Sequence, residues 1–184
     1  MCAVSSFPEA RITADRLDIR EFGPQDADLV REVLSNGEPE ALPPGAPSQP
    51  EGLAGWLAEL AHQPGRSGEG IHLMMLDRAH GKIVGAIGLF HADWDVRSAE
   101  AGYGVRSDER GKGYATEALV AVSRWALTAG GIQRVWLTAN VDNVASVRVA
   151  EKAGFVREGT LRRAALEADG LHDQAMFSLL DDEI

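Results

Sequence analysis

The segment Arg110-Gly-Lys-Gly-Tyr-Ala115 has the residue types of a phosphate site. Gly111 and Gly113 stand where an expected strand has ended and a long helix begins. The first N–H groups of a helix have no partners within it, and together with the helix dipole they attract anions. Arg110 and Lys112 add positive charge, so the segment predicts an anion site. The alternative is a tight turn that needs positive φ and is flanked by two solvated basic residues.

Other chemistries are less well supported by the sequence. The chain has no Gly-x-x-x-x-Gly-Lys-Ser/Thr phosphate loop, and the dinucleotide fingerprint lacks its third glycine and a surrounding βαβ unit. The five histidines show no metal-ligand spacing and Cys2 is the only cysteine, so we expect no metal site. His91, after an expected strand, is either a surface histidine or an edge of a substrate cleft.

Length, charge and cysteine content limit the class of protein. With 184 residues the chain is long enough for one domain with a core and short for two, so we expect a single domain over residues 1–184. The net charge of −10 disfavours nonspecific binding to nucleic acid or to an anionic membrane. No apolar run approaches the roughly 20 residues that span a bilayer. A single cysteine and an N-terminus unlike a secretory signal favour the cytoplasm.

The elements that position the glycine-rich segment follow from hydrophobic periodicity. Strands are expected at about residues 16–22, 71–77, 83–90, 99–105, 135–139, 155–165 and 174–180, and helices at about 26–35, 51–62, 113–129 and 142–154. The three strands between residues 71 and 105 follow one another through short turns and look antiparallel. This order predicts one α/β or α+β domain with a mixed sheet.

Two stretches of the chain resemble a known family. Glu100-Ala-Gly-Tyr-Gly-Val105, followed by Arg110-Gly-Lys-Gly-Tyr-Ala-Thr-Glu-Ala-Leu119, resembles the pyrophosphate-binding segment of the GNAT superfamily of acetyltransferases. The family pattern Arg/Gln-x-x-Gly-x-Gly/Ala is met by Arg110, Gly113 and Ala115. Asn140-Val-Asp-Asn-Val-Ala-Ser146, with the later Glu158-Gly-Thr-Leu-Arg162, resembles the RimJ/RimL subgroup, which acetylates N-terminal amines of ribosomal proteins.

The resemblance implies a fold and a cofactor. The GNAT fold has a mixed, mostly antiparallel sheet, here of about seven strands, with helices on both faces. Its central strands, here about 99–105 and 135–139, splay apart and hold acetyl-CoA between them. The residues implied to bind this cofactor are Val105, through its backbone, Arg110, Gly111, Lys112, Gly113, Tyr114, Ala115, Asn143 and Ser146.

The resemblance also implies catalytic roles, each with a structural alternative. Glu100 matches the base of some GNAT members, or it is a strand carboxylate paired with a cross-strand arginine. Ser146 matches the serine near the sulfur in RimJ/RimL-type proteins, and Asn143 a ligand of the pantetheine arm. Both residues are also favourable at the start of a helix, as N-cap and third residue.

We therefore expect an N-acetyltransferase that transfers acetyl from acetyl-CoA to a primary amine, either a protein N-terminus or a small molecule. The alternative is a catalytically silent acyl-CoA-binding module. In the ribosomal-protein enzymes of the subgroup, a glutamate base occupies the position that Ala165 holds here, and the next glutamate, Glu167, lies two residues later. This departure from the subgroup puts a ribosomal-protein substrate in doubt. A homodimer is left open, because this fold frequently dimerises.

Overall fold

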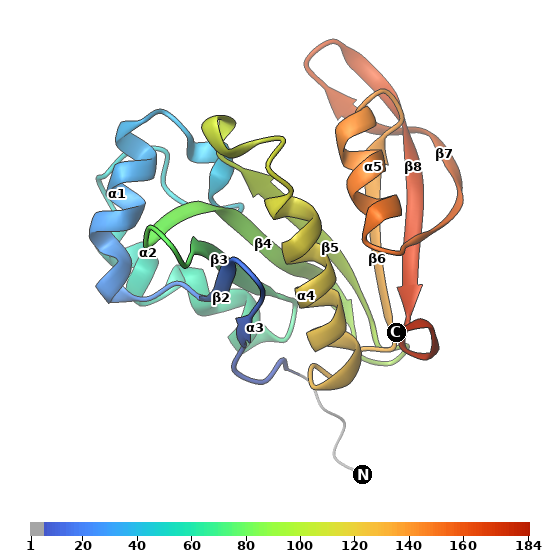
Figure 1. Ribbon diagram of the computed structural model, residues 1–184, viewed down its shortest axis with the longest axis horizontal. Coiled ribbons are helices and arrows are strands. Elements are labelled where there is room, and N and C mark those ends of the chain that lie inside the picture. Colours follow the sequence, from blue (N-terminus) through green and yellow to red (C-terminus); the bar gives the residue numbers. More distant parts are fainter. Residues whose placement is uncertain (1–5) are drawn as a thin grey trace.

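The computed structural model describes residues 6–184, in which one eight-stranded sheet has the order β1-β2-β3-β4-β5-β6-β8-β7 (Figure 1). The strands are β1 (Arg11–Thr13), β2 (Leu17–Glu21), β3 (Ile71–Asp77), β4 (Lys82–Asp93), β5 (Ser98–Val105), β6 (Arg134–Asn140), β7 (Val156–Glu167) and β8 (Gly170–Leu180). Every neighbouring pair is antiparallel except β5 and β6. The mixed, mostly antiparallel sheet is confirmed.

The expected count of about seven strands is one too low for the described residues. The additional strand, β1, has three residues and pairs with β2 at the edge of the sheet. Three residues are too few to show a period of two, so the sequence pattern does not reveal it. The β7–β8 hairpin is also longer than expected, because its two strands continue to Glu167 and Gly170.

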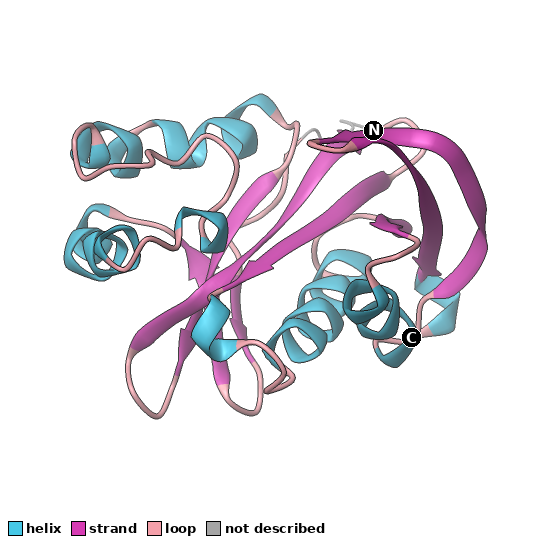
Figure 2. Cartoon of the chain, turned by 90° about the horizontal axis from the view of Figure 1, so that it is seen from above, coloured by secondary structure: helices cyan, strands magenta, loops and turns pink. Residues whose placement is uncertain are grey.

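Helices lie on both faces of the sheet, as predicted (Figure 2). They are α1 (Ala27–Ser35), α2 (Leu53–Ala58), α3 (Gln63–Ser67), α4 (Tyr114–Thr128) and α5 (Val144–Lys152). On β3, Leu73 and Met75 join the core that includes α4, whereas Met74 joins the core of α1 and α2. Successive strand side chains point to opposite faces, so a continuously apolar strand serves two cores. Within residues 6–184, no helix is long and apolar enough to cross a bilayer.

The two central strands separate part of the way along their length. The parallel pairing of β5 with β6 covers Ser98–Arg134, Ala99–Val135 and Glu100–Trp136. Beyond this point β5 stays paired with β4 as far as Val105, and β6 stays paired with β8 as far as Asn140. The gap that opens between the two ribbons is visible in Figure 1. The predicted splaying of the central strands is confirmed, and we call the point where it begins the fork.

Candidate active site

The glycine-rich segment lies between β5 and the first turn of α4. Gly111 and Gly113 have φ of 77° and 88°, a left-handed conformation that glycine adopts without steric cost. Gly113 is the N-cap of α4, and among the described residues no side chain caps it. The first N–H groups of a 15-residue helix are therefore free of a side-chain cap, beside Arg110 and Lys112. This arrangement fits a phosphate group.

Side-chain contacts of Arg16 at the surface and of Tyr114 in the interior fix this segment in place. The guanidinium of Arg16 lies 4.6 Å from the centre of the Tyr114 ring. It donates to the carbonyl of Lys112 at 2.9 Å and to the carboxylate of Glu117 at 2.8 Å. The Tyr114 hydroxyl donates to buried Asp77 at 3.0 Å. The Tyr114 side chain therefore anchors the loop, and only its backbone is left for a cofactor.

Not every cation near the segment is free for an anion. The Lys112 ammonium lies 2.8 Å from the carboxylate of Glu109, which also pairs with Lys82. The two lysines together hold the pKa of Glu109 below its usual value. Arg110 is exposed, and its Nε donates to the carbonyl of Val105 at 3.1 Å. Both predicted residues, Val105 and Arg110, thus lie together at the end of β5 that has no pairing with β6.

Substitution of Asp77 by asparagine tests the anchor of the loop. A hydrogen bond with His80 lowers the pKa of Asp77 to about 2, with help from the N–H of Ala79 and the hydroxyl of Tyr114, while burial opposes the shift. Because the folded pKa is depressed, the stabilisation is complete above the unfolded pKa and is lost as pH falls from about 4 toward about 2. Asp77→Asn should cost about 2 kcal/mol of unfolding free energy, which lowers Tm by about 4–8 °C.

Thermal melts of Asp77→Asn between pH 7 and pH 2 check this expectation. The wild type should lose more stability over the acid range than the variant does. Asp182→Asn, at an exposed position near the C-terminus, is the control and should follow the wild type. Parallel curves for wild type and Asp77→Asn would show that this carboxylate does not stabilise the loop through its charge.

Glu100 lies at the fork and contacts a histidine rather than the cross-strand arginine considered from the sequence. Its Oε2 lies 2.8 Å from Nδ1 of His91. The Glu100 side chain is 22% exposed and that of His91 77%. His91 belongs to β4, where the register with β5 is interrupted between Phe90 and Asp93, and it has a φ of 48°. An ionised Glu100 only accepts hydrogen bonds, so the His91 ring is the donor.

The start of α5 faces β5 across the separation. The Asn143 side chain accepts from the N–H of Ser146 at 3.1 Å, which confirms its role as N-cap. The Ser146 Oγ remains available and lies 3.2 Å from the hydroxyl of Tyr103 on β5. Burial raises the pKa of Tyr103, against the effect of its contact with Ser146, so the phenol stays protonated at neutral pH.

Tyr103 is the residue of this site that sequence reasoning missed. It belongs to the Glu100–Val105 strand and lies three residues after Glu100, so its side chain points to the opposite face. The alternation of side chains along this strand could therefore have predicted that Tyr103 and Glu100 lie on opposite faces of the sheet, with Tyr103 on the face of α4 and α5. Its contact with Ser146 joins residues 43 positions apart, which a single sequence does not reveal.

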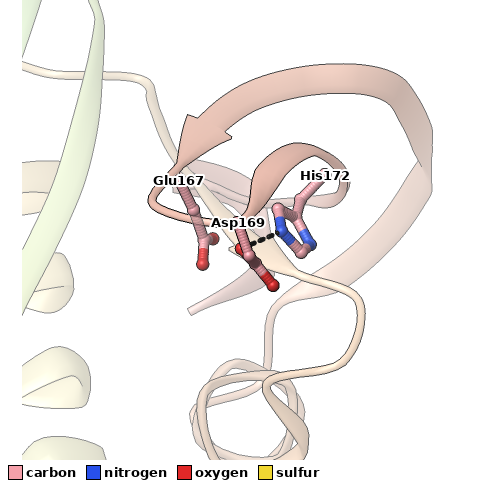
Figure 3. A group of neighbouring side chains, drawn as sticks. All are labelled: Glu167, Asp169 and His172. Carbon is pink, nitrogen blue, oxygen red and sulfur yellow. Dashed lines mark hydrogen bonds and ion pairs between the residues drawn. The ribbon is translucent and has the colours of Figure 1, made fainter.

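Glu167, the carboxylate that follows the expected position of the base, lies near the tip of the β7–β8 hairpin. Ala165 lies opposite His172, and Glu167 is still in β7, where its carboxylate accepts from the side-chain amide of Asn140 at 2.8 Å. In Figure 3, His172 contacts Asp169, with Nε2 and Oδ1 2.7 Å apart. Ligand atoms of Glu167, Asp169 and His172 lie within 4.8 Å of one another. These groups sit at the surface and have hydrogen-bond partners, so we assign them no metal.

A cavity of about 490 Å³ lies over β4 and β5. Its floor contains Ala86, Gly88, Phe90, Gly102 and Gly104, and its roof contains the proline-rich loop after η2 (Pro39–Ala41). Phe90 is the cross-strand neighbour of Glu100, so the cavity and Glu100 are on the same face of the sheet. The site thus has three parts that meet at β5: the glycine-rich segment 110–115, which we call the anion loop, the fork and the cavity.

Comparison with known proteins agrees with this geometry. The family model of the acetyltransferase (GNAT) domain matches residues 16–156. The chain is 24% identical to the uncharacterized N-acetyltransferase p20 of Bacillus licheniformis, over 92% of this chain and 95% of that protein. It is 28% identical to the ribosomal-protein-serine acetyltransferase of Escherichia coli strain K12, over 55% of this chain and 56% of the relative.

A solved structure shows the same fold. RimL, a ribosomal L7/L12 α-N-protein acetyltransferase in complex with coenzyme A, superposes with a TM-score of 0.80 at 17% identity, over 95% of this chain and 100% of the other. The chain belongs to the GNAT family of acetyltransferases. It is an acetyl-CoA-dependent N-acetyltransferase, and its relatives include the ribosomal-protein enzymes that the RimJ/RimL resemblance indicated.

Proposed function

We propose that this chain acetylates a primary amine that approaches the fork from the face of the sheet that bears Glu100. The observation that carries the proposal is the end of β5–β6 pairing at Glu100 and Trp136. Among the described residues, this leaves the inner edges of both strands without a partner strand, between the anion loop and the cavity. When bound, acetyl-CoA supplies the acetyl thioester to this gap. The loop from Arg110 to Ala115 would hold its pyrophosphate, and Val105 and Asn143 its pantetheine arm.

Glu100 is proposed as the general base. Most amines are protonated at neutral pH, and only the neutral form attacks a thioester. Glu100 takes a proton from the ammonium, directly or through a water molecule, and the neutral nitrogen then forms the C–N bond and loses its second proton to water. His91, at 2.8 Å, donates to the same carboxylate and orients it, so His91 is a positioning residue.

Ser146 is proposed to protonate the leaving sulfur. As the C–S bond breaks, the Ser146 hydroxyl gives a proton to the thiolate and takes one from the Tyr103 hydroxyl, 3.2 Å away, and solvent water returns a proton to Tyr103. Tyr103 acts through Ser146 and is therefore a positioning residue for this step. The N-cap bond from Asn143 holds the first turn of α5, and so Ser146, in place.

Substitution of Ser146 by alanine should lower kcat by about 10-fold to 100-fold. We expect a loss at or below the lower end of the rate contribution that a general acid ordinarily makes, because the leaving group is a thiolate. The KM for acetyl-CoA should change by less than about threefold, because the backbone of the first turn is retained. Tyr103→Phe should lower kcat less than Ser146→Ala does. Steady-state kinetics with thiol detection measure both values. A rise in KM at unchanged kcat would assign Ser146 to binding alone.

The acceptor, the cellular location and the assembly belong to the same proposal. The relatives named for ribosomal-protein acetylation favour an N-terminal amine, whereas Ala165 in place of the expected glutamate favours another amine. We infer one domain over residues 1–184 that acts in the cytoplasm. Sedimentation of the purified chain distinguishes a monomer from a homodimer.

A further inference from the structure

We propose that the preferred acceptor is a small monoamine with an uncharged, apolar body, and that this body occupies the cavity over β4 and β5. The inference rests on the proposed function and names the class of amine. It follows from the lining of the cavity, from the absence of basic side chains in that lining, and from the pairing of its backbone.

The floor of the cavity is a smooth apolar surface built from alternate residues of two strands. Ala86 faces Gly104, Gly88 faces Gly102, and Phe90 faces Glu100 across the β4–β5 ladder. Because cross-strand neighbours share a face, this row leads from the cavity toward the Glu100 carboxylate. An amine whose body lies on this row would direct its nitrogen toward Glu100.

The glycines of the floor let the walls of the cavity lie close to the sheet. A Cβ at Gly104 would lie 2.2 Å from the carbonyl oxygen of Glu40, so only glycine lets η2 approach the strand this closely. A Cβ at Gly102 would lie 3.1 Å from the Phe90 ring. The cavity left between these walls has a volume of about 490 Å³, which falls in the range of small-molecule sites.

The chemistry of the lining selects against charged acceptors. The roof is formed by Leu42, Pro43, Pro44, Gly45 and Ala46. Of the residues in the described part of the chain that line the cavity, only Glu40 is acidic or basic, and it occupies an exposed position of η2. The carboxylate of a free amino acid would find no cation here, and a second ammonium would lose its hydration against apolar groups. An uncharged body has no carboxylate that needs a cation and no second ammonium that would lose its hydration.

The backbone of the floor selects against a peptide. The β4–β5 ladder is continuous from Gly85–Val105 to Phe90–Glu100. The N–H and C=O groups that β4 and β5 direct at each other therefore form hydrogen bonds between the two strands. A peptide that lies over this ladder could not form the hydrogen bonds of an added strand with them. The edge of β5 that lacks a β6 partner faces the fork, where the proposed function places the pantetheine arm. A small amine requires no backbone pairing.

An acceptor panel with a cavity variant tests this inference. The probes are 2-phenylethylamine, ethylamine, spermidine, glycine and a peptide with N-terminal alanine, each at saturating acetyl-CoA. For the wild type, kcat/KM should be at least about 10-fold higher for 2-phenylethylamine than for ethylamine, because a larger apolar body is buried. Ala46→Leu, which fills the cavity from its roof, should abolish most of this preference and leave the KM for acetyl-CoA unchanged.

Two controls keep the test decisive. Ala54→Leu makes the same change at an exposed position of α2 and should retain the preference. If Ala46→Leu does not fold, Gly102→Ala narrows the cavity from the floor. A higher kcat/KM for spermidine or the peptide, or an unchanged preference in the variants, would overturn the inference and leave the proposed function standing. If no amine in the panel is acetylated, the proposed function itself fails.

Discussion

Replacement of Glu100 by glutamine should lower kcat at neutral pH by about 10²-fold or more, which is the ordinary contribution of a general base. Glutamine keeps the size of the side chain but cannot take a proton from the amine. The variant should regain activity as pH rises, because a larger fraction of the amine is then already neutral. The wild type should depend less steeply on pH over the same range. Initial rates of thiol release from pH 6 to pH 10 measure both profiles.

Two further variants separate a base from a structural carboxylate. His91→Gln removes the ring that donates to Glu100 at 2.8 Å but keeps the carboxylate, so it should lower kcat less than Glu100→Gln does. Asp18→Asn, on the surface of β2, is the matched control and should leave kcat unchanged. Wild-type turnover with the same pH profile in Glu100→Gln would exclude Glu100 as the base.

Replacement of Gly113 by valine should raise the KM for acetyl-CoA by about 10-fold to 100-fold. A β-branched residue at a φ of 88° is a steric outlier that costs about 1–2 kcal/mol, so the loop relaxes away from the conformation that presents its N–H groups. Because the loss concerns binding, kcat at saturating acetyl-CoA should fall much less than kcat/KM. Titration of coenzyme A by calorimetry measures the same loss without turnover.

Gly52→Val provides a matched control for this substitution. Gly52 is the N-cap of α2 and Gly113 the N-cap of α4, and both have left-handed φ, at 82° and 88°. Both variants should lose similar stability, but only Gly113→Val should lose affinity for coenzyme A. Equal losses of affinity in the two variants would show that the effect comes from general destabilisation rather than from the anion loop.

The two helix starts that we propose to hold the cofactor are the part of the site whose local structure could be predicted from the sequence. Apart from Val105, the residues proposed to bind the cofactor lie in two short segments, 110–115 and 143–146, and closely spaced glycines and caps leave a local signal. The helix start at Gly113 and the N-cap at Asn143 were both expected and are both present. The splayed strands followed from the family resemblance rather than from any local pattern.

The acceptor side depends on contacts between distant parts of the chain. His91 meets Glu100 only because β4 continues past Phe90 and breaks register there, which no periodicity indicates. The roof of the cavity comes from a proline-rich loop that lies over Gly104. The departure at Ala165 was visible in the sequence, yet the partner of Glu167, Asn140, became evident only with the fold.

We propose that this chain transfers acetyl from acetyl-CoA to an amine at the fork between β5 and β6. The most direct measurement follows thiol release and the acetylated product together, in the wild type and in Glu100→Gln, with the amine varied at saturating acetyl-CoA. We expect amine-dependent, saturable release with one acetylated amine for each thiol, and a loss of about 10²-fold in Glu100→Gln. Tight binding of acetyl-CoA with no amine-dependent release would contradict the claim, because the chain would then be a silent acyl-CoA-binding module.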